Sequence, residues 1–252
     1  MKYDYLLKKC DLCRRHCGVN RLNGELGICT ANDNLIVARA ELHLWEEPPI
    51  SCENGSGTVF FSHCNLKCVF CQNHEISQEY KGAEITINRL SDIFLELQNK
   101  GANNINLVTP THYVPQIIEA IEIAKYKGLK LPILYNTNGY DTLETIKLLD
   151  GYIDVYLPDF KYFDDKYSIK YSKAKDYSSE IIPILKEMVR QTGKPSFDDK
   201  GRILKGVIIR HLMLPGLLFD SKKVIDKIYS TFGDDVYISI MNQYTPMHTS
   251  SK

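Results

Sequence analysis

Three cysteines stand close together in the stretch SHCNLKCVFCQN. Cys64, Cys68 and Cys71 follow a C-x3-C-x2-C spacing, and the run holds no fourth cysteine. A structural zinc site is usually closed by four Cys or His ligands. A [4Fe–4S] cluster held by only three cysteines leaves one iron open to a small molecule. The spacing therefore predicts a cluster with an open iron, and half of a zinc knuckle is the alternative.

Four further cysteines lie near the N-terminus in a different pattern. Cys10, Cys13, Cys17 and Cys29 are spaced C-x2-C-x3-C-x11-C. Four thiols this close predict a closed, four-ligand metal site, for which zinc and a second iron–sulfur cluster are both open. Free buried thiols are the alternative. Cys52 stands alone, and we interpret it as a small buried residue.

The composition of the chain excludes several classes of function. Lys plus Arg and Asp plus Glu each number 31, so the formal net charge is zero and indicates neither nucleic acid nor an anionic membrane as partner. The sequence has no apolar run long enough to span a bilayer, and its N-terminus does not resemble a signal peptide. We therefore expect a cytoplasmic protein, in which clustered cysteines are more often ligands than disulfides.

The elements that must position these cysteines alternate along the chain. Six apolar runs predict strands, and each but the last is followed by a helical pattern. The expected strands are 57–64, 104–110, 131–136, 152–159, 205–216 and 235–243, and the expected helices are 88–101, 113–128, 141–151, 178–193 and 221–233. Such a pattern indicates a parallel sheet with helices outside it. Right-handed crossovers curl six units into a partial (β/α)6 TIM-type barrel, and an open doubly wound sheet is the alternative.

The expected domain boundary falls in the stretch EEPPISCENGSG, which is rich in Pro and Gly. Residues 1–56 would form a Cys-rich, metal-binding segment. Residues 57–252 would form the partial barrel.

Polar residues follow the ends of several predicted strands, where barrel active sites are assembled. The loop of Cys64 follows the first strand, NTNG follows the third and PDFK the fourth. Asp159 and Lys161 are two positions apart, so on an extended segment they face the same way. Arg210 lies in an apolar strand, where a charge is costly unless it is matched to a carboxylate or aimed at a ligand.

The loop of Cys64, with Phe70 just before its third cysteine, resembles the cluster loop of the radical S-adenosylmethionine (SAM) superfamily. NINLVTPTHYVPQI, YNTNGY, VYLPDFKY, IRHLMLPG and ISIMNQYTP resemble segments of its pyruvate formate-lyase-activating enzyme-like branch. The resemblance implies a [4Fe–4S] cluster on Cys64, Cys68 and Cys71. SAM would bind the fourth iron and be cleaved to methionine and a 5′-deoxyadenosyl radical, which abstracts hydrogen from a protein or peptide. A glycyl radical enzyme is one partner that this resemblance implies, other peptides or small molecules are the alternatives, and an electron donor such as flavodoxin or ferredoxin is expected.

The same resemblance assigns the contacts to SAM. Lys161 is expected to meet the SAM carboxylate, Asp159 to order that region and Arg210 to face the ligand. The segment VTPTH departs from the family, which usually carries a Gly-Gly-Glu-like segment there, so threonine hydroxyls and backbone carbonyls are expected to receive the amino group. The expected cofactor-binding residues are Phe70, Thr109, Thr111, Asn136, Thr137, Asp159, Lys161 and Arg210.

The end of the chain is a second departure from this resemblance. Family members continue beyond QYTP into a closing helical region, whereas this chain stops at Lys252. We therefore expect a barrel without the usual closing region. Two other interpretations remain, a zinc-stabilised binding protein without radical chemistry and a truncated, inactive remnant.

Overall fold

The fold is an α/β arrangement built on a mostly parallel sheet. The computed structural model describes residues 2–246. The six expected strands are present, and each pairs in parallel with the next. They are β2 (Ser56–Phe61), β4 (Ile105–Val108), β5 (Ile133–Thr137), β6 (Val155–Pro158), β8 (Ile203–Leu212) and β9 (Tyr237–Met241). The predicted α/β class is confirmed, and the order of strands is consistent with a partial TIM-type barrel.

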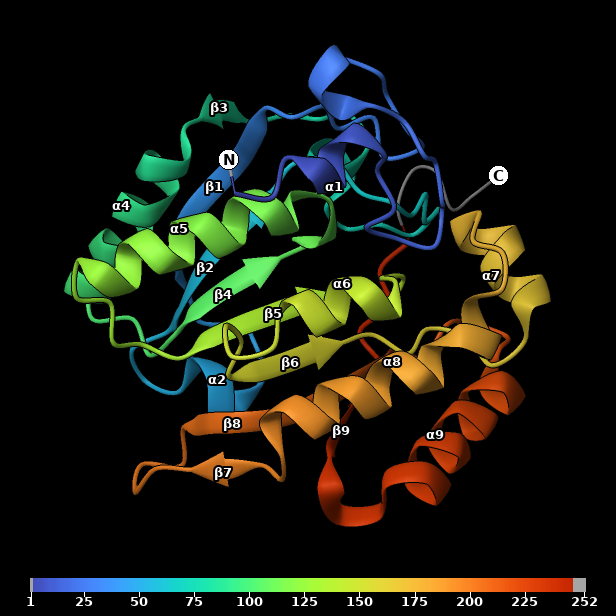
Figure 1. Ribbon diagram of the computed structural model, residues 1–252. Helices are drawn as coiled ribbons and strands as arrows, with labels where there is room; N and C mark the ends of the chain where they lie inside the picture. Colours follow the sequence, from blue (N-terminus) through green and yellow to red (C-terminus); the bar gives the residue numbers. More distant parts are fainter. Residues whose placement is uncertain (1, 247–252) are drawn as a thin grey trace.

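Helices connect these strands in the expected order and lie along the outside of the sheet (Figure 1). The longer ones are α4 (Ile87–Asn99), α5 (Val114–Tyr126), α6 (Leu143–Leu148), α7 (Asp165–Ser172), α8 (Tyr177–Thr192) and α9 (Leu218–Phe232). Short turns of helix are α1 (Tyr5–Lys8), α2 (Pro48–Ser51) and α3 (His74–Ser77). Helices α4, α5, α8 and α9 each bury an apolar stripe, as Ile117, Ile121 and Ala124 do in α5, and this burial fixes them to the sheet.

The start of α6 differs from the prediction. The sequence places Asp141 at the start of the expected helix 141–151, as its cap, and this prediction is wrong. The Thr142 hydroxyl is the cap, because it accepts a hydrogen bond from the backbone amide of Thr145. The Asp141 side chain is instead fully buried.

Three further strands extend the sheet in antiparallel directions. They are β1 (Leu35–His43) beside β2, β3 (Ala83–Ile85) beside β1 and β7 (Ser196–Phe197) beside β8. Because β1 lies before residue 56, the sheet crosses the expected domain boundary. Within the described residues β2 and β9 do not pair, so the barrel is open along that side. The expected lack of a closing region after the last strand concerns residues 247–252, which lie outside the described residues.

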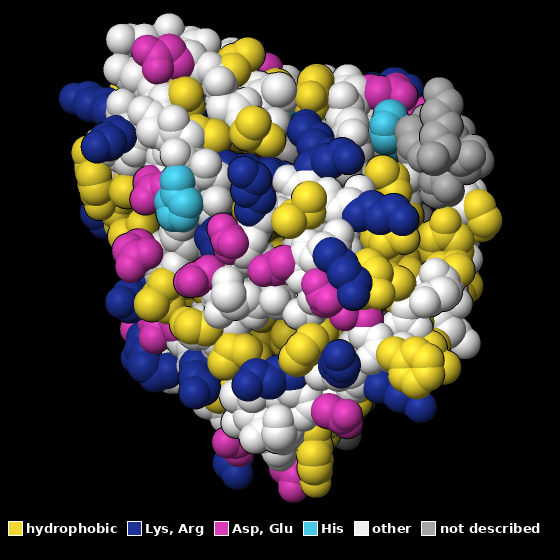
Figure 2. Space-filling model, turned by 90° about the vertical axis from the view of Figure 1, so that its right-hand side faces the viewer, with side chains coloured by type: hydrophobic (Ala, Val, Ile, Leu, Met, Phe, Trp, Pro, Cys, Tyr) yellow, Lys and Arg dark blue, Asp and Glu magenta, His cyan; other side chains and the backbone are white. Residues whose placement is uncertain are grey.

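The carboxyl ends of β4, β5 and β6 point to the right in Figure 1, where the N-terminal segment lies. Figure 2 views this end directly, and there basic, acidic and apolar side chains are intermixed. A search of residues 2–246 finds no helix with both the length and the apolarity to cross a membrane.

Candidate active site

The loop after β2 brings three thiols into one cavity of about 250 Å³ at the carboxyl end of the sheet. Cys64, Cys68 and Cys71 line it together with residues from the ends of β4, β5, β6 and β8. The loop backbone is tied down by α7, since the Lys67 amide donates to the Ser172 carbonyl at 3.1 Å. A short loop fixed in this way presents its three sulfurs from one side of the cavity.

Each of these sulfur atoms has a polar neighbour suited to a thiolate. The pairs are Cys64 with the Asn138 amide nitrogen at 3.4 Å, Cys68 with the Ser172 hydroxyl at 3.0 Å and Cys71 with the Ser77 hydroxyl at 3.3 Å. Burial raises the pKa of Cys64 to about 12, so in the chain alone this thiol is protonated. A bound metal reverses that balance, because thiolates are the ligands that metals take.

The donor set fits an iron–sulfur cluster. In the part of the chain that is described, no three His, Cys, Asp or Glu side chains converge closely enough to hold one metal ion. A cluster does not require such convergence, because each cysteine binds a different iron. Cys64, Cys68 and Cys71 would hold three irons, and the described lining of the cavity offers no fourth cysteine.

A buried group of charges lies beside the cysteines. The Asp159 carboxylate is 2.5 Å from the Lys161 ammonium and 3.0 Å from the Arg210 Nε, and the three side chains are at most 17% exposed. Burial alone would raise the pKa of Asp159, but the two cations outweigh it and lower the pKa below its usual value. Asp159 is shared between two cations that line the cavity, and such cations suit a ligand carboxylate.

Arg210 has more partners than sequence reasoning proposed. Besides Asp159, its guanidinium donates to the Asn136 side-chain oxygen at 2.6 Å and lies 3.5 Å from the Glu46 carboxylate. Arg210 is thus matched to carboxylates inside the barrel while it also lines the cavity. Glu46 went unnoticed in the sequence because it stands outside every predicted element.

Seven of the eight expected cofactor-binding residues line the cavity, and Thr111 does not. The Thr111 hydroxyl donates to Asp141 at 2.8 Å and is buried, so it cannot receive a SAM amino group. Thr137 lines the cavity, but its hydroxyl donates to the same carboxylate at 2.5 Å. Thr137 therefore offers the cavity its backbone and methyl group more readily than its hydroxyl.

Asp141 is the centre of a buried network that sequence reasoning missed. Its carboxylate accepts hydrogen bonds from Thr111, Thr137 and the Tyr135 hydroxyl, the last at 2.8 Å. Burial raises the pKa of Asp141, and the three hydroxyls oppose that rise. The network ties the loops after β4 and β5 together beneath the cavity.

We expect Asp141→Asn to lower the free energy of unfolding by about 2–3 kcal/mol, because an amide accepts fewer hydrogen bonds than a carboxylate. Urea denaturation at neutral pH measures this change. Asp150→Asn is the matched control, since Asp150 forms only an exposed pair with Arg190 and should leave stability near the wild-type value. Equal stability of Asp141→Asn and wild type would contradict the network's role.

Thr109 adopts a left-handed backbone conformation with φ +58°. A β-branched residue there is strained, whereas glycine is free to adopt it. The family that this sequence resembles usually carries glycine in the corresponding segment. Thr109 lines the cavity, so this strain lies at the cavity wall. The Thr109 amide donates to the Asn136 carbonyl at 2.9 Å, and this hydrogen bond holds the backbone in place.

Asn138 and Asn65 are two further polar residues of the site. The Asn138 side-chain amide donates both to the Cys64 sulfur at 3.4 Å and to the Asn65 side-chain oxygen at 2.7 Å. An asparagine in NTNG is ordinarily a turn residue. Asn138 differs from an ordinary turn residue only because it lies close to Cys64 in the fold.

The four cysteines near the N-terminus do not join this cavity. We refer to Cys10, Cys13, Cys17 and Cys29 as the head cysteines. They line a pocket of their own together with His112.

The sequence matches the Radical SAM superfamily over residues 58–228. That match covers more than half of the 252 residues, and the chain therefore belongs to this superfamily. A similar protein is the uncharacterized protein MJ0674 of Methanocaldococcus jannaschii, which is 30% identical over 256 residues covering 98% of this chain and 69% of the relative.

Solved structures with a similar fold include SuiB of Streptococcus suis bound to the precursor peptide SuiA, with a TM-score of 0.52, 16% identity and coverage of 75% of this chain and 39% of SuiB. SuiB bound to S-adenosylmethionine has a TM-score of 0.50 and 17% identity, and the match covers 73% of this chain and 40% of SuiB. The FeFe-hydrogenase maturase HydG of Carboxydothermus hydrogenoformans has a TM-score of 0.51 and 14% identity, and the match covers 75% of this chain and 46% of HydG. The chain thus spans less than half the length of these proteins, and the likeness concerns the fold.

Membership in this superfamily implies a [4Fe–4S] cluster and SAM. The thiols of the Cys64 loop and the cations Lys161 and Arg210 beside Asp159 are the parts of this structure that fit them.

Proposed function

We propose that this protein is an enzyme that uses a [4Fe–4S] cluster and SAM for radical chemistry. The supporting observation is that three thiols of one loop share a cavity with Asn136, Lys161 and Arg210 at the carboxyl end of the sheet. When bound, the reduced cluster supplies the electron that splits SAM into methionine and a 5′-deoxyadenosyl radical.

The residues of this chain have distinct tasks in this proposal. Lys161 attracts the SAM carboxylate, and Asp159 holds Lys161 in place through their 2.5 Å contact. Phe70 and Met241 give the cavity apolar walls that exclude water from a reactive radical. The hydrogen bond from Asn138 lowers the cost of negative charge on the Cys64 sulfur.

The substrate in this proposal is a protein or peptide, and activation of a glycyl radical enzyme by hydrogen abstraction is the specific reaction. Resemblance of the segments around the site to the activase-like branch supports it, and SuiB, whose fold is similar, was solved with a precursor peptide. The mixed charges at the carboxyl end of the sheet suit a protein partner better than a polyanion (Figure 2). Flavodoxin or ferredoxin would donate the electron in the cytoplasm.

The test is cleavage of SAM by the full chain, reconstituted without oxygen with iron and sulfide. We expect a brown protein that forms 5′-deoxyadenosine and methionine once dithionite is added, and none while the cluster is oxidised. A colourless protein that binds zinc and leaves SAM intact would contradict the proposal and favour a metal-stabilised binding protein.

The activase part is tested separately with a glycyl radical enzyme encoded beside this gene. We expect its glycyl radical to appear in electron paramagnetic resonance (EPR) spectra in proportion to the SAM consumed. Cleavage of SAM without that radical would refute this reaction and leave the cluster chemistry standing.

A further inference from the structure

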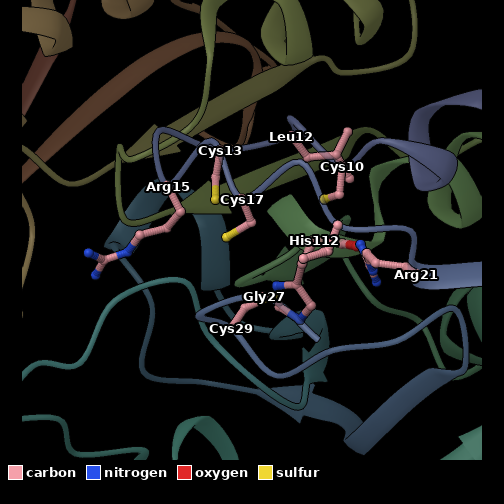
Figure 3. A pocket seen from close by; sticks show the side chains of 10 residues that line it. Cys10, Leu12, Cys13, Arg15, Cys17, Arg21, Gly27, Cys29 and His112 are labelled. Atoms are coloured by element: carbon pink, nitrogen blue, oxygen red, sulfur yellow. The ribbon is translucent and has the colours of Figure 1, made fainter. Parts of the chain in front are cut away.

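The head cysteines surround a pocket that the radical chemistry does not use. Figure 3 shows the sulfur atoms of Cys10, Cys13 and Cys17 in this pocket beside the imidazole of His112. The thiol of Cys29 belongs to the same lining and is buried. Because thiols and an imidazole are the side chains that soft metals prefer, the pocket has the chemistry of a metal site.

His112 offers this pocket a nitrogen that has no partner. The ring is 3% exposed, and its Nε2 donates to the Ser62 carbonyl at 2.7 Å. Nδ1 makes no hydrogen bond within the described residues. A buried acceptor without a partner is costly, and such exceptions call for a missing ligand or ion.

Arg21 adds a positive charge that also lacks a counterpart. It is completely buried at the edge of the same pocket. Within residues 2–246 its hydrogen bonds go only to the backbone carbonyls of Asn32 and His112, which carry no net charge. A buried cation without an anion is unfavourable, so the pocket favours a group of net negative charge.

The backbone of this segment is shaped around sulfur. A Cβ at Gly27 would lie 2.8 Å from the Cys17 sulfur, so only glycine fits there. The next amide, that of Ile28, donates to the same sulfur at 3.5 Å. The glycine leaves room for the Cys17 sulfur. The amide directed at that sulfur stabilises a thiolate.

In the Cys64 loop the Leu66 backbone amide donates to the Cys64 sulfur at 3.4 Å, and two other head cysteines receive a backbone amide in the same way. The backbone amide of Arg15 donates to the Cys13 sulfur. The backbone amide of Ala31 donates to the Cys29 sulfur. In each case the amide lies two residues after the cysteine. Both groups of cysteines therefore have the same local design.

We propose that the head cysteines hold a second iron–sulfur cluster, whose negative charge is balanced by Arg21. Four thiolates give such a centre a net negative charge, and each binds a different iron. This agrees with the described side chains, which nowhere converge in threes around a single ion. A single zinc would need four ligands at one point.

The second cluster would lie directly against the loop of the first. The Arg15 Nε donates to the Asn65 carbonyl at 2.8 Å, and Asn65 follows Cys64 in the sequence. Cys13 forms a β-bridge with Asp141, next to the buried network under the cavity. Loading the head cysteines would therefore also steady the Cys64 loop.

The test counts iron and sulfide in the full chain after all three cysteines of the Cys64 loop are replaced, as Cys64→Ala/Cys68→Ala/Cys71→Ala. We expect this variant to retain about four irons and four sulfides per chain, and wild type to hold about eight irons. Adding Cys17→Ala and Cys29→Ala to the triple variant should remove this iron. Because only metal content is measured, the result is independent of whether the protein cleaves SAM.

Cys52→Ala is the matched control in the triple variant, since Cys52 is a half-buried thiol outside both groups. It should leave the iron count unchanged. Circular dichroism shows whether each variant is folded, and the wild-type count remains decisive if the triple variant is not. Zinc instead of iron in the head, no metal in a folded triple variant, or only about four irons in wild type would each overturn the second cluster.

Discussion

Cys68→Ala is expected to reduce SAM cleavage to the uncatalysed background, a loss of at least about a thousandfold. The thiol of Cys68 is one of three that line the cavity, and its only side-chain hydrogen-bond partner in the described residues is the Ser172 hydroxyl. Alanine removes one ligand without disturbing the fold of the loop. The cluster then has two protein ligands instead of three. It is therefore no longer held with a single iron free to bind SAM.

Two measurements separate this effect from unfolding. Iron should fall by about four per chain, while the circular dichroism spectrum stays that of wild type. Cys52→Ala is the control for loss of a thiol outside the site and should cleave SAM at the wild-type rate. Full cleavage by Cys68→Ala would mean that the cluster uses other ligands.

Asp159→Asn is expected to lower the free energy of unfolding by about 3–5 kcal/mol at neutral pH, because it removes the carboxylate that Lys161 and Arg210 share and leaves Arg210 only the more distant Glu46. Lys161 and Arg210 both contact Asp159 and are 17% and 15% exposed. Neither can turn into water without leaving the barrel. SAM binding should weaken as well, since Lys161 loses the contact that positions it.

The pH dependence of this variant gives a sharper test. The folded-state pKa of Asp159 is lowered, so its contribution to stability is present above the unfolded pKa of about 3.9 and is lost as pH falls through the folded value. The difference between wild type and Asp159→Asn should therefore shrink below about pH 4.

Urea denaturation across this pH range measures that difference. Asp226→Asn is a suitable control, because Asp226 lies exposed on α9 away from this group and should change stability little. A constant difference down to pH 3 would show that the carboxylate charge is not what stabilises the group.

The sequence was informative wherever local pattern decides structure. Apolar runs of strand length predicted β2, β4, β5, β6, β8 and β9, and the cysteine spacing singled out a loop whose three thiols line one cavity. Asp159 and Lys161 were predicted to face the same way because of their spacing alone, and their side chains do meet. Such features depend on neighbours in the chain.

Features that depend on distant parts of the chain could not be predicted. Thr111 was expected at the cavity and instead donates to Asp141, because the loops after β4 and β5 meet beneath it. Glu46 reaches Arg210 from a stretch that looked like a linker. Strand β1 joins the sheet although its residues belong to the Cys-rich segment. Each of these outcomes follows from tertiary contacts that no local pattern records.

The central claim is that the Cys64 loop leaves one iron of its cluster free for SAM. Electron–nuclear double resonance on the reduced protein tests it directly, with SAM carrying ¹⁵N in the amino group and ¹⁷O in the carboxylate. We expect both labels to couple magnetically to a cluster that is lost in Cys68→Ala. Absence of both couplings at saturating SAM, with an EPR spectrum that SAM does not change, would show that the fourth iron is already bound by a side chain and would contradict the account.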